Sequence, residues 1–446
     1  AGLTVGVIGT VNNRYTGRDG KQIILSTQFT TPEALLLQEV LREMADAGVS
    51  HVIMEVSSHA LAQARVGGVL FDIVAMTNLS RDHLDYHQSM AEYFRAKCVL
   101  FDDHVRDHSI AVLPVCIREN ERREWLVTLH KRCQKTCEQT ISWGEEEGAD
   151  IRLAGFSLSL CQTEIEVQVS GEAYRFSSPL VGRFNIDNVL TVFALSIALG
   201  LERKAIVKAL STAPGAPGRL ERVQVKGVST DRTSAVFVDY AHTPDALEKV
   251  LETVSALPHR NLFCVFGCGG DRDKGKRPVM GRIASRLSDI AIVTDDNPRT
   301  ENSEQIIQEI LAGLENGQME EKNRGWLLSS KEAGRGYVVI QDRRLAIESA
   351  IEAAGTEDIV VIAGKGHEPY QITSKGKKFF DDRLIAENTQ LHWTPKQVEA
   401  AVGGVMHPPA VHGWLLGKVL TDSRVEGRRN IFVALKGEKH DAHDFA

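Results

Sequence analysis

The sequence lacks a hydrophobic run long enough to cross a membrane, and it carries no excess of positive charge. No apolar stretch approaches the ~18 residues of a membrane-spanning helix, and the first residues show no signal-peptide pattern. The formal net charge of -7 gives no electrostatic support for binding to nucleic acid. We therefore expect a cytoplasmic protein without a membrane or nucleic-acid partner.

Cysteine is also scarce. The 446 residues hold 7 cysteines, an odd number spread thinly, which excludes the disulfide framework of small secreted domains. Two pairs, Cys133 with Cys137 and Cys264 with Cys268, have a spacing that a metal could use, but no histidine cluster accompanies either pair. Reduced structural thiols are therefore favoured over a zinc site.

Strand-like apolar runs alternate with helical patterns along most of the chain. The runs at 5–8, 51–56, 73–77 and 110–114 show the βαβ rhythm of a parallel sheet. Between 151 and 180 apolar residues alternate with polar ones, which predicts an antiparallel hairpin added to that sheet. The Pro- and Gly-rich segment Ser211–Gly218 is the best linker candidate, and a second α/β rhythm follows it.

The predicted fold class is α/β, and the length calls for more than one hydrophobic core. Residues 1–213 form a mostly parallel-sheet domain that is incomplete at its N-terminus. Residues 214–390 form a Rossmann-like α/β domain. Residues 391–446 are part of a further domain, and so short a tail is not expected to fold independently.

The most informative stretch is the apolar run Ile290–Val293, which ends abruptly in the polar sequence Asp295–Arg299. In an open α/β sheet, ligands bind just beyond the carboxyl ends of the strands. Arg299 could grip a carboxylate with two guanidinium nitrogens while an acidic neighbour takes an ammonium, so an amino acid is the natural ligand. The alternative is that an Asp or Asn here caps the helix predicted over Glu304–Leu314.

Two other strand ends carry groups suited to a metal and to phosphate. Glu55 ends one strand, the segment Asn78–His87 with His83 follows the next, and Lys97 comes one helical stretch later. Together these groups predict a site for Mg²⁺ and phosphate, although a lone histidine such as His83 is more often structural.

No true phosphate loop is found in the sequence. Gly270–Arg277 approaches the Walker pattern, but Arg277 stands where a Ser or Thr would hold Mg²⁺. Arg272 likewise occupies the third glycine position of a dinucleotide fingerprint, so we interpret the segment as a glycine loop that presents Arg272. At Gly364–Glu368, glycines let the backbone approach a ligand and Glu368 could pair with an ammonium, with a plain turn as the alternative.

In this order, the motifs between residues 3 and 386 resemble the Mur ligase family of peptidoglycan synthesis, and within it the branch that adds meso-diaminopimelate. They are TTP at 30–32, EVSSH at 55–59, NLSRDHLDYH at 78–87, AK at 96–97, GRFNIDN at 182–188, GR at 218–219, DYAHTPDAL at 239–247, GCGGDRDKGKRP at 267–278, DNPR at 296–299 and GKGHE at 364–368. The resemblance implies a ligase that uses ATP and Mg²⁺ to join meso-diaminopimelate to UDP-MurNAc-L-Ala-D-Glu through an acyl phosphate.

The resemblance also implies a role for each group of residues. Glu55, His83 and Lys97 match the catalytic metal-site positions, and the lysine is one that the family carbamylates. Contacts to the UDP-muramoyl dipeptide are implied for Thr30, Thr31, Ser57, Gln63 and Arg65. Positions near the nucleotide are matched by Asn185, Asn188, Arg219 and Asp239. The amino-acid pocket is matched by Arg272, Asp296, Asn297, Pro298, Arg299, Gly364 and Glu368.

Arg299 matters most for the choice of amino acid, because lysine-adding relatives of the family lack it. Diaminopimelate differs from lysine by one carboxylate at the far end. An arginine buried to meet that carboxylate would be left unpaired by lysine, and discrimination from such unpaired groups can reach ~10⁴.

Two departures from the family pattern lead to further expectations. The family's phosphate loop and uridine-binding domain would precede Ala1, so we expect the 446-residue chain not to make product alone. The tail, with Thr421–Arg424, Ile431–Glu438 and Asp441–Phe445, resembles the opening of a D-alanyl-D-alanine-adding (MurF-like) ligase. The two resemblances predict a fusion of two ligases, with a stray extension as the alternative. In that fusion, residues 1–213 are the central ATPase-type domain of the first ligase, and residues 391–446 are the partial N-terminal α/β domain of the second.

Three other functions are weighed against the ligase. A dehydrogenase would need the dinucleotide fingerprint that is missing here. A folylpolyglutamate synthetase would explain the Lys97 region but not the motifs at 296–299 and 364–368. A non-catalytic nucleotide- or amino-acid-binding fragment is compatible with the absence of a phosphate loop.

Overall fold

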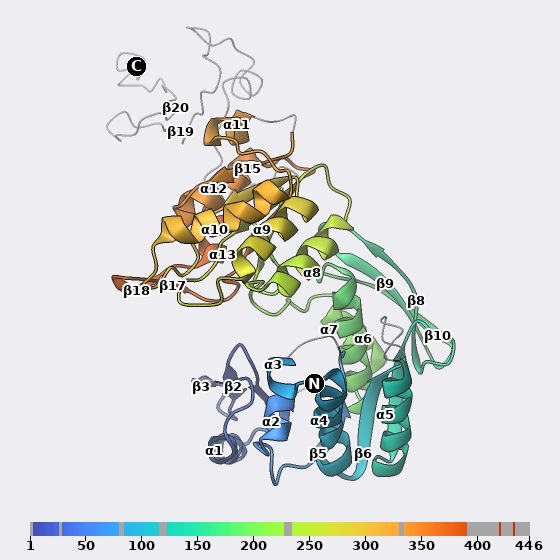
Figure 1. The fold of residues 1–446 in the computed structure, drawn as a ribbon. Coiled ribbons are helices and arrows are strands. Elements are labelled where there is room, and N and C mark those ends of the chain that lie inside the picture. The colour runs from blue at the N-terminus through green and yellow to red at the C-terminus, as the bar shows by residue number, and fades with distance from the viewer. Residues whose placement is uncertain are drawn as a thin grey trace, which may run out of the picture. The chain divides into compact units, whose positions relative to one another are not determined.

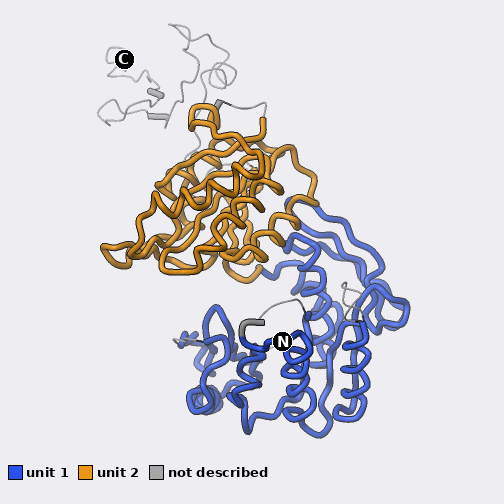
Figure 2. Tube along the Cα trace, in the orientation of Figure 1, with its two compact units in different colours: residues 1–214 blue, residues 215–446 orange. Residues whose placement is uncertain are grey.

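The computed structural model describes residues 3–25, 29–79, 84–115, 123–226, 234–329 and 334–389, with the short strands at 419–420 and 431–432. The chain divides into two compact units, unit 1 (Ala1–Pro214) and unit 2 (Gly215–Ala446), which Figure 2 shows in two colours. Both units are mixed α/β structures that contain parallel strands, as the sequence predicts.

Unit 1 contains a four-stranded sheet of order β3-β2-β1-β4. Its strands are β1 (Val5–Ile8), β2 (Asn13–Thr16), β3 (Gln22–Leu25) and β4 (His51–Met54). Strand β1 runs parallel to β4 and antiparallel to β2, and β2 and β3 form a hairpin.

A second, six-stranded sheet of unit 1 has the order β10-β9-β8-β7-β6-β5. Its strands are β5 (Phe71–Ala75), β6 (Val105–Pro114), β7 (Gln139–Gly144), β8 (Ile151–Leu158), β9 (Thr163–Val169) and β10 (Glu172–Ser178). Strands β5 to β8 are parallel, and β8 to β10 are antiparallel, so the predicted antiparallel addition is confirmed and extends over three strands. Its alternating Ile165, Val167 and Val169 are all buried in one core.

The expectation of one parallel sheet in unit 1 is wrong, because β4 and β5 belong to different sheets. Strand β4 is the last strand of the four-stranded sheet, and β5 is the last strand of the six-stranded sheet. No described strand pairs with the outer edge of β4 or of β5, and Val52 and Ile53 of β4 are exposed. A βαβ rhythm shows that strands and helices alternate, but it does not say which strands become neighbours.

Seven helices of the described part of unit 1 cover these sheets (Figure 1). They are α1 (Ala34–Asp46), α2 (Ser58–Ala62), α3 (Leu84–His87), α4 (Met90–Asp103), α5 (Arg123–Thr136), α6 (Arg183–Ala198) and α7 (Arg203–Leu210). Helix α1 buries Leu37, Val40 and Met44, at helical spacing, in the core that contains Ile8 of β1. Helix α6 packs its apolar face on the six-stranded sheet.

Unit 2 is built on one six-stranded sheet of order β11-β12-β16-β13-β14-β15. Its strands are β11 (Glu221–Val223), β12 (Ala235–Asp239), β13 (Leu262–Phe266), β14 (Ile290–Val293), β15 (Gly336–Val339) and β16 (Ile359–Ala363). All but the edge strand β11 are parallel. Every residue of β12, β13, β14 and β16 is buried, as expected for strands with helices on both faces.

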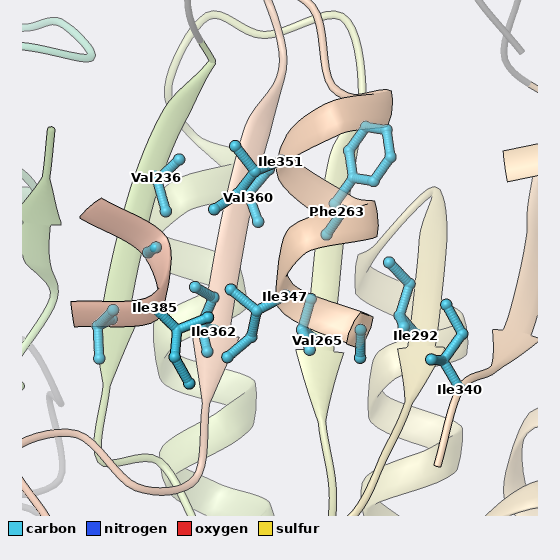
Figure 3. Close-up of a cluster of buried hydrophobic side chains, with 14 of the residues drawn as sticks. Val236, Phe263, Val265, Ile292, Ile340, Ile347, Ile351, Val360, Ile362 and Ile385 are labelled. Carbon is cyan, nitrogen blue, oxygen red and sulfur yellow. The ribbon is translucent and has the colours of Figure 1, made fainter. Parts of the chain in front are cut away.

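The helices of unit 2 form a layer on each face of this sheet. They are α8 (Pro244–Ser255), α9 (Lys276–Leu287), α10 (Ser303–Asn316), α11 (Arg324–Ser329), α12 (Arg343–Ala353) and α13 (Asp382–Glu387). Figure 3 shows Ile347 and Ile351 of α12 and Ile385 of α13 against strand residues such as Val360 and Ile362. Helix α9 packs against both α8 and α10, and α8 and α9 also contact strands β16 and β14, respectively.

Two strand pairs lie outside these sheets. The hairpin β17 (Tyr370–Thr373) and β18 (Gly376–Phe379) follows the loop after β16. Strands β19 (Val419–Leu420) and β20 (Ile431–Phe432) form a short parallel pair. The rest of the tail after residue 389, including the predicted motifs at 421–424 and 441–445, lies outside the described residues.

Candidate active site

The carboxyl edge of the unit 2 sheet gathers the residues implied for the amino-acid pocket. Strands β13, β14 and β16 are parallel neighbours, so the loops that follow them lie side by side. These loops hold Gly267–Arg272, Thr294–Arg299 and Gly364–Glu368.

Asn297 links two of these loops. Its side-chain Oδ1 accepts hydrogen bonds from Lys365 Nζ at 3.1 Å and from the backbone N of Ile372 at 2.9 Å. Its Nδ2 donates to Glu368 Oε2 at 3.3 Å. The structure therefore brings together Asn297 and Glu368, which the sequence assigned to one pocket, and adds Lys365, which it did not.

Asp296 is buried beside the same lysine. Its Oδ1 lies 3.6 Å from Lys365 Nζ and finds no hydrogen-bond partner among the described residues. Lys365 is itself fully buried, and burial lowers the pKa of its ammonium, opposed by the carboxylates of Asp296 and Glu368. The pocket wall thus contains a buried lysine and a buried aspartate next to the partly exposed Glu368.

Arg299 is held in a backbone conformation that is uncommon for a residue other than glycine, with φ of 53°. Its backbone N donates to Ile372 O at 3.1 Å, and its Nη1 donates to Gly270 O at 2.6 Å. The guanidinium therefore reaches across to the loop that follows β13, the loop that contains Arg272.

Close approach of these two loops requires glycine. A Cβ on Gly270 would lie 1.9 Å from Pro298 O, and a Cβ on Gly267 would lie 2.1 Å from Thr294 O. Gly270 N also donates to Asn297 O at 2.9 Å. The glycines at 267 and 270 are thus explained by packing against the sequence Asp296–Arg299. Arg272 is exposed, and its Nη1 bonds to the carbonyl of the adjacent Asp271 at 3.3 Å.

Two buried arginines stabilise these loops through ion pairs and hydrogen bonds to loop carbonyls. The sequence did not assign either of them to the site. Arg277 makes ion pairs with Glu301 at 2.9 Å and Glu309 at 2.8 Å and donates to Gly269 O. Its neighbour Glu301 also accepts the backbone N–H of Asp271. The position that departs from the Walker pattern is therefore a support for the glycine loop.

Arg343, at the start of α12, does the same beneath the loop after β16. It forms a bidentate pair with Asp382, at 2.9 Å and 2.7 Å, and donates to Ala363 O and Asp295 O. Both partners are fully buried. The only signal in the sequence was a charged residue at a position where a buried apolar residue is expected. Its partner lies 39 positions later and could not be identified from one sequence.

Asp239 and Arg219 lie at the neighbouring end of β12. Asp239 accepts backbone hydrogen bonds from Leu220 at 2.7 Å and Ala241 at 2.8 Å, and its burial raises the pKa of the carboxyl. The Arg219 guanidinium lies 5.0 Å from the centre of the Tyr240 ring. Gly218 has φ of 67°, and a Cβ there would lie 2.1 Å from His367 N. The segment from 218 to 219 thus packs on the Gly364–Glu368 loop.

In unit 1, the residues around Glu55 form a more open cradle. Glu55 Oε2 accepts from the hydroxyl of Thr10 at 2.8 Å and from its backbone N at 3.1 Å, and the Thr10 and Thr30 hydroxyls lie 3.0 Å apart. Thr31 is buried, donates to Glu55 O at 2.9 Å and accepts from Ser57 N at 3.0 Å. The structure brings together Thr30, Thr31, Glu55 and Ser57.

Arg65 and Gln63 adjoin this cradle. Arg65 donates to Thr31 O at 3.2 Å and to Gln63 Oε1 at 2.8 Å, and its Nη2 pairs with Glu33 at 3.2 Å. Ser57 caps helix α2 by accepting from Ala60 N. All five residues implied to contact the UDP-linked substrate therefore lie in one connected region.

The predicted metal ligands are placed only in part. Lys97 lies on α4 with its Nζ 4.9 Å from the centre of the Tyr93 ring, and Glu55 is exposed. His83 lies outside the described residues. Among the described residues, no group of three or more His, Cys, Asp or Glu side chains is arranged to hold a metal ion.

Asn185 and Asn188 occupy the first turns of α6. Asn185 Nδ2 donates to Val181 O at 2.8 Å, and Asn188 Nδ2 donates to Asn185 Oδ1 at 3.1 Å. The two implied nucleotide contacts are therefore in contact with each other, while Arg219 and Asp239 belong to unit 2.

The capping interpretation of Asp295–Arg299 is wrong. Helix α10 begins at Ser303, and the side chain of Asn302 caps it by accepting from the backbone N of Glu304 and Gln305. Asp296 and Asn297 are thus left to the pocket.

These two units carry the signature of one enzyme family. A model described as the Mur ligase middle domain matches residues 2–196, and one described as the Mur ligase glutamate ligase domain matches residues 218–366. The chain therefore belongs to the Mur ligase family, as the resemblance implied. The dehydrogenase interpretation is excluded by this membership.

The relatives narrow the comparison further. A curated protein of Gloeobacter violaceus, named UDP-N-acetylmuramoyl-L-alanyl-D-glutamate--2,6-diaminopimelate ligase, is 42% identical over 85% of this chain and 70% of its own length. A solved structure of a ligase of the same name is 33% identical, with a TM-score of 0.60, and the match covers 86% of this chain and 72% of that one. The folylpolyglutamate synthase of Mycobacterium tuberculosis, at 17% identity and a TM-score of 0.55 over 81% of this chain and 82% of its own, shares the fold alone.

The helices of the described residues show no candidate for a membrane span. None of their helices combines the length and the apolar character needed to cross a bilayer.

Proposed function

We propose that this protein is an ATP-dependent ligase that adds meso-diaminopimelate to UDP-MurNAc-L-Ala-D-Glu. The names of the curated relatives support the proposal. The observation that carries it is the placement of Arg299 in the same loop system as Asp296, Asn297 and Glu368, at the carboxyl edge of the unit 2 sheet. An arginine for a distal carboxylate and acceptors for an ammonium match the two ends of a diamino diacid.

The proposed chemistry has two steps. The terminal carboxylate of the dipeptide attacks the γ-phosphorus of ATP, which gives an acyl phosphate and releases ADP. The amine of diaminopimelate then attacks the acyl carbon, phosphate leaves with the pair of electrons of the broken C–O bond, and the nitrogen loses a proton. Activation is necessary because a carboxylate does not react with an amine at neutral pH, and alignment of the two substrates supplies much of the rate.

We assign the remaining residues by the motifs that they share with the family. The cradle of Thr30, Thr31, Ser57, Gln63 and Arg65 would bind the UDP-linked dipeptide through its hydroxyl, amide and guanidinium groups. Asn185, Asn188, Arg219 and Asp239 would lie near ATP, and Arg272, Pro298 and Gly364 would complete the amino-acid pocket. Mg²⁺, held by Glu55 with His83 and carbamylated Lys97, would neutralise phosphate oxygens when bound, and the hard oxygen donors of Glu55 suit that ion.

Two further proposals concern the setting of the enzyme. We place it in the cytoplasm, which the free thiols of all six described cysteines support. We also infer three domains, at 1–213, 214–390 and 391–446, the last being the opening of a MurF-like ligase. The motif resemblance at 431–445 supports the fusion, and the mass of the native polypeptide tests it, since a fusion has about the summed mass of two ligases.

The Arg299→Asn variant tests the proposed function. Asparagine tolerates the left-handed backbone at this position better than most residues, so the loop is preserved while the guanidinium is lost. By isothermal titration calorimetry, the native protein is expected to bind meso-diaminopimelate at least ~10³-fold more tightly than L-lysine. The variant should bind the two amino acids about equally.

Arg286→Asn is the matched control, because Arg286 is an exposed arginine of the same unit that pairs with Glu248. It should retain the native preference. Equal affinity of the native protein for the two amino acids would contradict the proposed specificity.

A further inference from the structure

Lys365 is a fully buried charged residue of the amino-acid pocket to which the sequence assigned no role. Its side chain is fully buried in the loop after β16, and three acceptors from the pocket converge on its Nζ. They are Asn297 Oδ1 at 3.1 Å, Asp296 Oδ1 at 3.6 Å and Glu368 Oε2 at 3.8 Å.

We propose that Lys365 is a positioning residue that serves as the internal counter-ion of the amino-acid pocket, so that the pocket accepts one further ammonium. This inference rests on the proposed function and refines it. The two carboxylates of Asp296 and Glu368 and the single ammonium of Lys365 leave one negative charge for the ligand to neutralise.

The other charged groups that act on Lys365 support this count. Arg343 and Asp382 also lie near Lys365, but they form a buried bidentate pair at 2.7 Å and neutralise each other. On the remaining side, Lys365 Nζ lies 5.6 Å from the centre of the Tyr370 ring, and Tyr240 OH donates to Glu368 Oε1 at 3.5 Å. Neither tyrosine is charged near neutral pH, since burial raises the pKa of both.

The carboxylates also retain capacity for a ligand. Asp296 is 6% exposed, and its Oδ1 has no hydrogen-bond partner among the described residues. Such an oxygen is costly to bury unless another donor completes its shell. Glu368 is partly exposed, with 20% of its side chain accessible, so an ammonium can reach the pair.

The lysine prevents a competing event. Two carboxylates that share a buried site without a cation raise the pKa of one of them, and the pair then holds a proton. A proton in that place would have to leave before a ligand ammonium could bind. Lys365 would therefore supply the cation between the two carboxylates and hold Asn297 in place before the amino acid arrives.

The Lys365→Met variant tests this role, because methionine has similar length and no charge. Binding of meso-diaminopimelate is measured by calorimetry at pH 6 in two buffers of different ionisation enthalpy, which gives the number of protons released. The native protein should release no proton from this pair. The variant should release close to one proton per ligand and bind roughly 10-fold or more weakly, with its preference over L-lysine retained.

Two controls separate this role from a purely structural one. The double variant Lys365→Met/Asp296→Asn restores the count of charges and should bind without releasing a proton. Arg260→Met breaks an ion pair between a partly exposed arginine and the buried Asp358, at 2.7 Å, at the amino edge of the same sheet. It should lower the melting temperature without altering proton release or affinity.

The outcomes distinguish this inference from the proposed function. If native protein fails to bind meso-diaminopimelate, the proposed function falls and the inference falls with it. If the native protein binds and folded Lys365→Met binds without proton release, the inference alone is overturned. Should Lys365→Met fail to fold, the double variant decides: proton release from it would refute the count of charges.

Discussion

The loops at the carboxyl edge of the unit 2 sheet and the cradle around Glu55 in unit 1 are built by different means. In unit 2, Lys365, Arg277 and Arg343 are fully buried and bind carboxylates and backbone carbonyls that hold three loops together. In unit 1, Glu55 is exposed and held by hydroxyl and backbone N–H groups of a threonine.

The difference matches the sizes of the two proposed ligands. A small amino acid must be recognised by a few fixed groups, and fixing them in advance lowers the entropy lost on binding. A large UDP-linked substrate can gain affinity from many moderate contacts over an open surface. Variants that loosen the unit 2 loops should therefore weaken binding of the amino acid far more than variants of the unit 1 cradle weaken binding of the UDP-linked substrate.

The largest effect is expected from Gly270→Ala. The new methyl group would lie 1.9 Å from Pro298 O and would push the loop that carries Asn297 and Arg299. Misplacement of a binding group by about 1 Å can cost roughly 10²-fold, so we expect a loss of that order in affinity for meso-diaminopimelate by calorimetry. Gly334→Ala, where a Cβ has open space, is the control. Native affinity in Gly270→Ala would show that the loops are not rigidly coupled.

An intermediate effect, on stability rather than on ligand binding, is expected from Thr31→Val in unit 1. The change leaves Glu55 O and Ser57 N without their buried hydroxyl partner, at a cost of about 1–3 kcal/mol in the free energy of unfolding. Scanning calorimetry or urea unfolding measures it. Thr128→Val, on an exposed turn of α5, should change stability by less than about 0.5 kcal/mol. Equal effects of the two variants would argue against a built cradle.

The smallest effect is a pH dependence of unit 2. Hydrogen bonds from the side chain of Arg277 and the backbone of Asp271 lower the pKa of Glu301 to about 2 from its usual 4.5. Because the folded pKa is depressed, this contribution to stability is present above pH 4.5 and is lost as the pH falls toward 2. In the Arg277→Met variant, the melting temperature of unit 2 should depend less on pH over that window. If the melting temperature of the variant depends on pH as strongly as that of the native protein, Glu301 is not the source of the pH dependence. Arg286→Met serves as the control.

Local patterns in the sequence predicted much of this arrangement. The apolar run of β14 followed by Asp295–Arg299 gave a strand and a loop at its carboxyl end, where the pocket residues are found. The alternation at 165, 167 and 169 gave the antiparallel strands. These features depend on neighbours in the chain, which a single sequence displays directly.

Features that depend on distant partners were missed. Lys365 reads as a flexible residue between two glycines, and its burial against Asn297 follows only from the order β16-β13-β14 in the sheet. In the sequence, Arg277 is only a departure from the phosphate-loop pattern. Its structural role could not be predicted, because its partners Glu301 and Glu309 come from a later loop and helix. The division of unit 1 into two sheets likewise depends on pairing, which periodicity does not encode. The roles of the site residues stay predictions until variants are measured.

The left-handed backbone at Arg299 has a consequence for how the protein can change. Main-chain groups anchor this position, through the bond from its N to Ile372 O, and the guanidinium adds one bond to the loop that follows β13, from Nη1 to Gly270 O. The proposed choice of amino acid therefore depends on the guanidinium, whereas the fold of the loop depends mainly on the main chain of the same residue. A lineage could exchange one amino acid for another in its cell wall by altering a single codon, without rebuilding the scaffold that presents it.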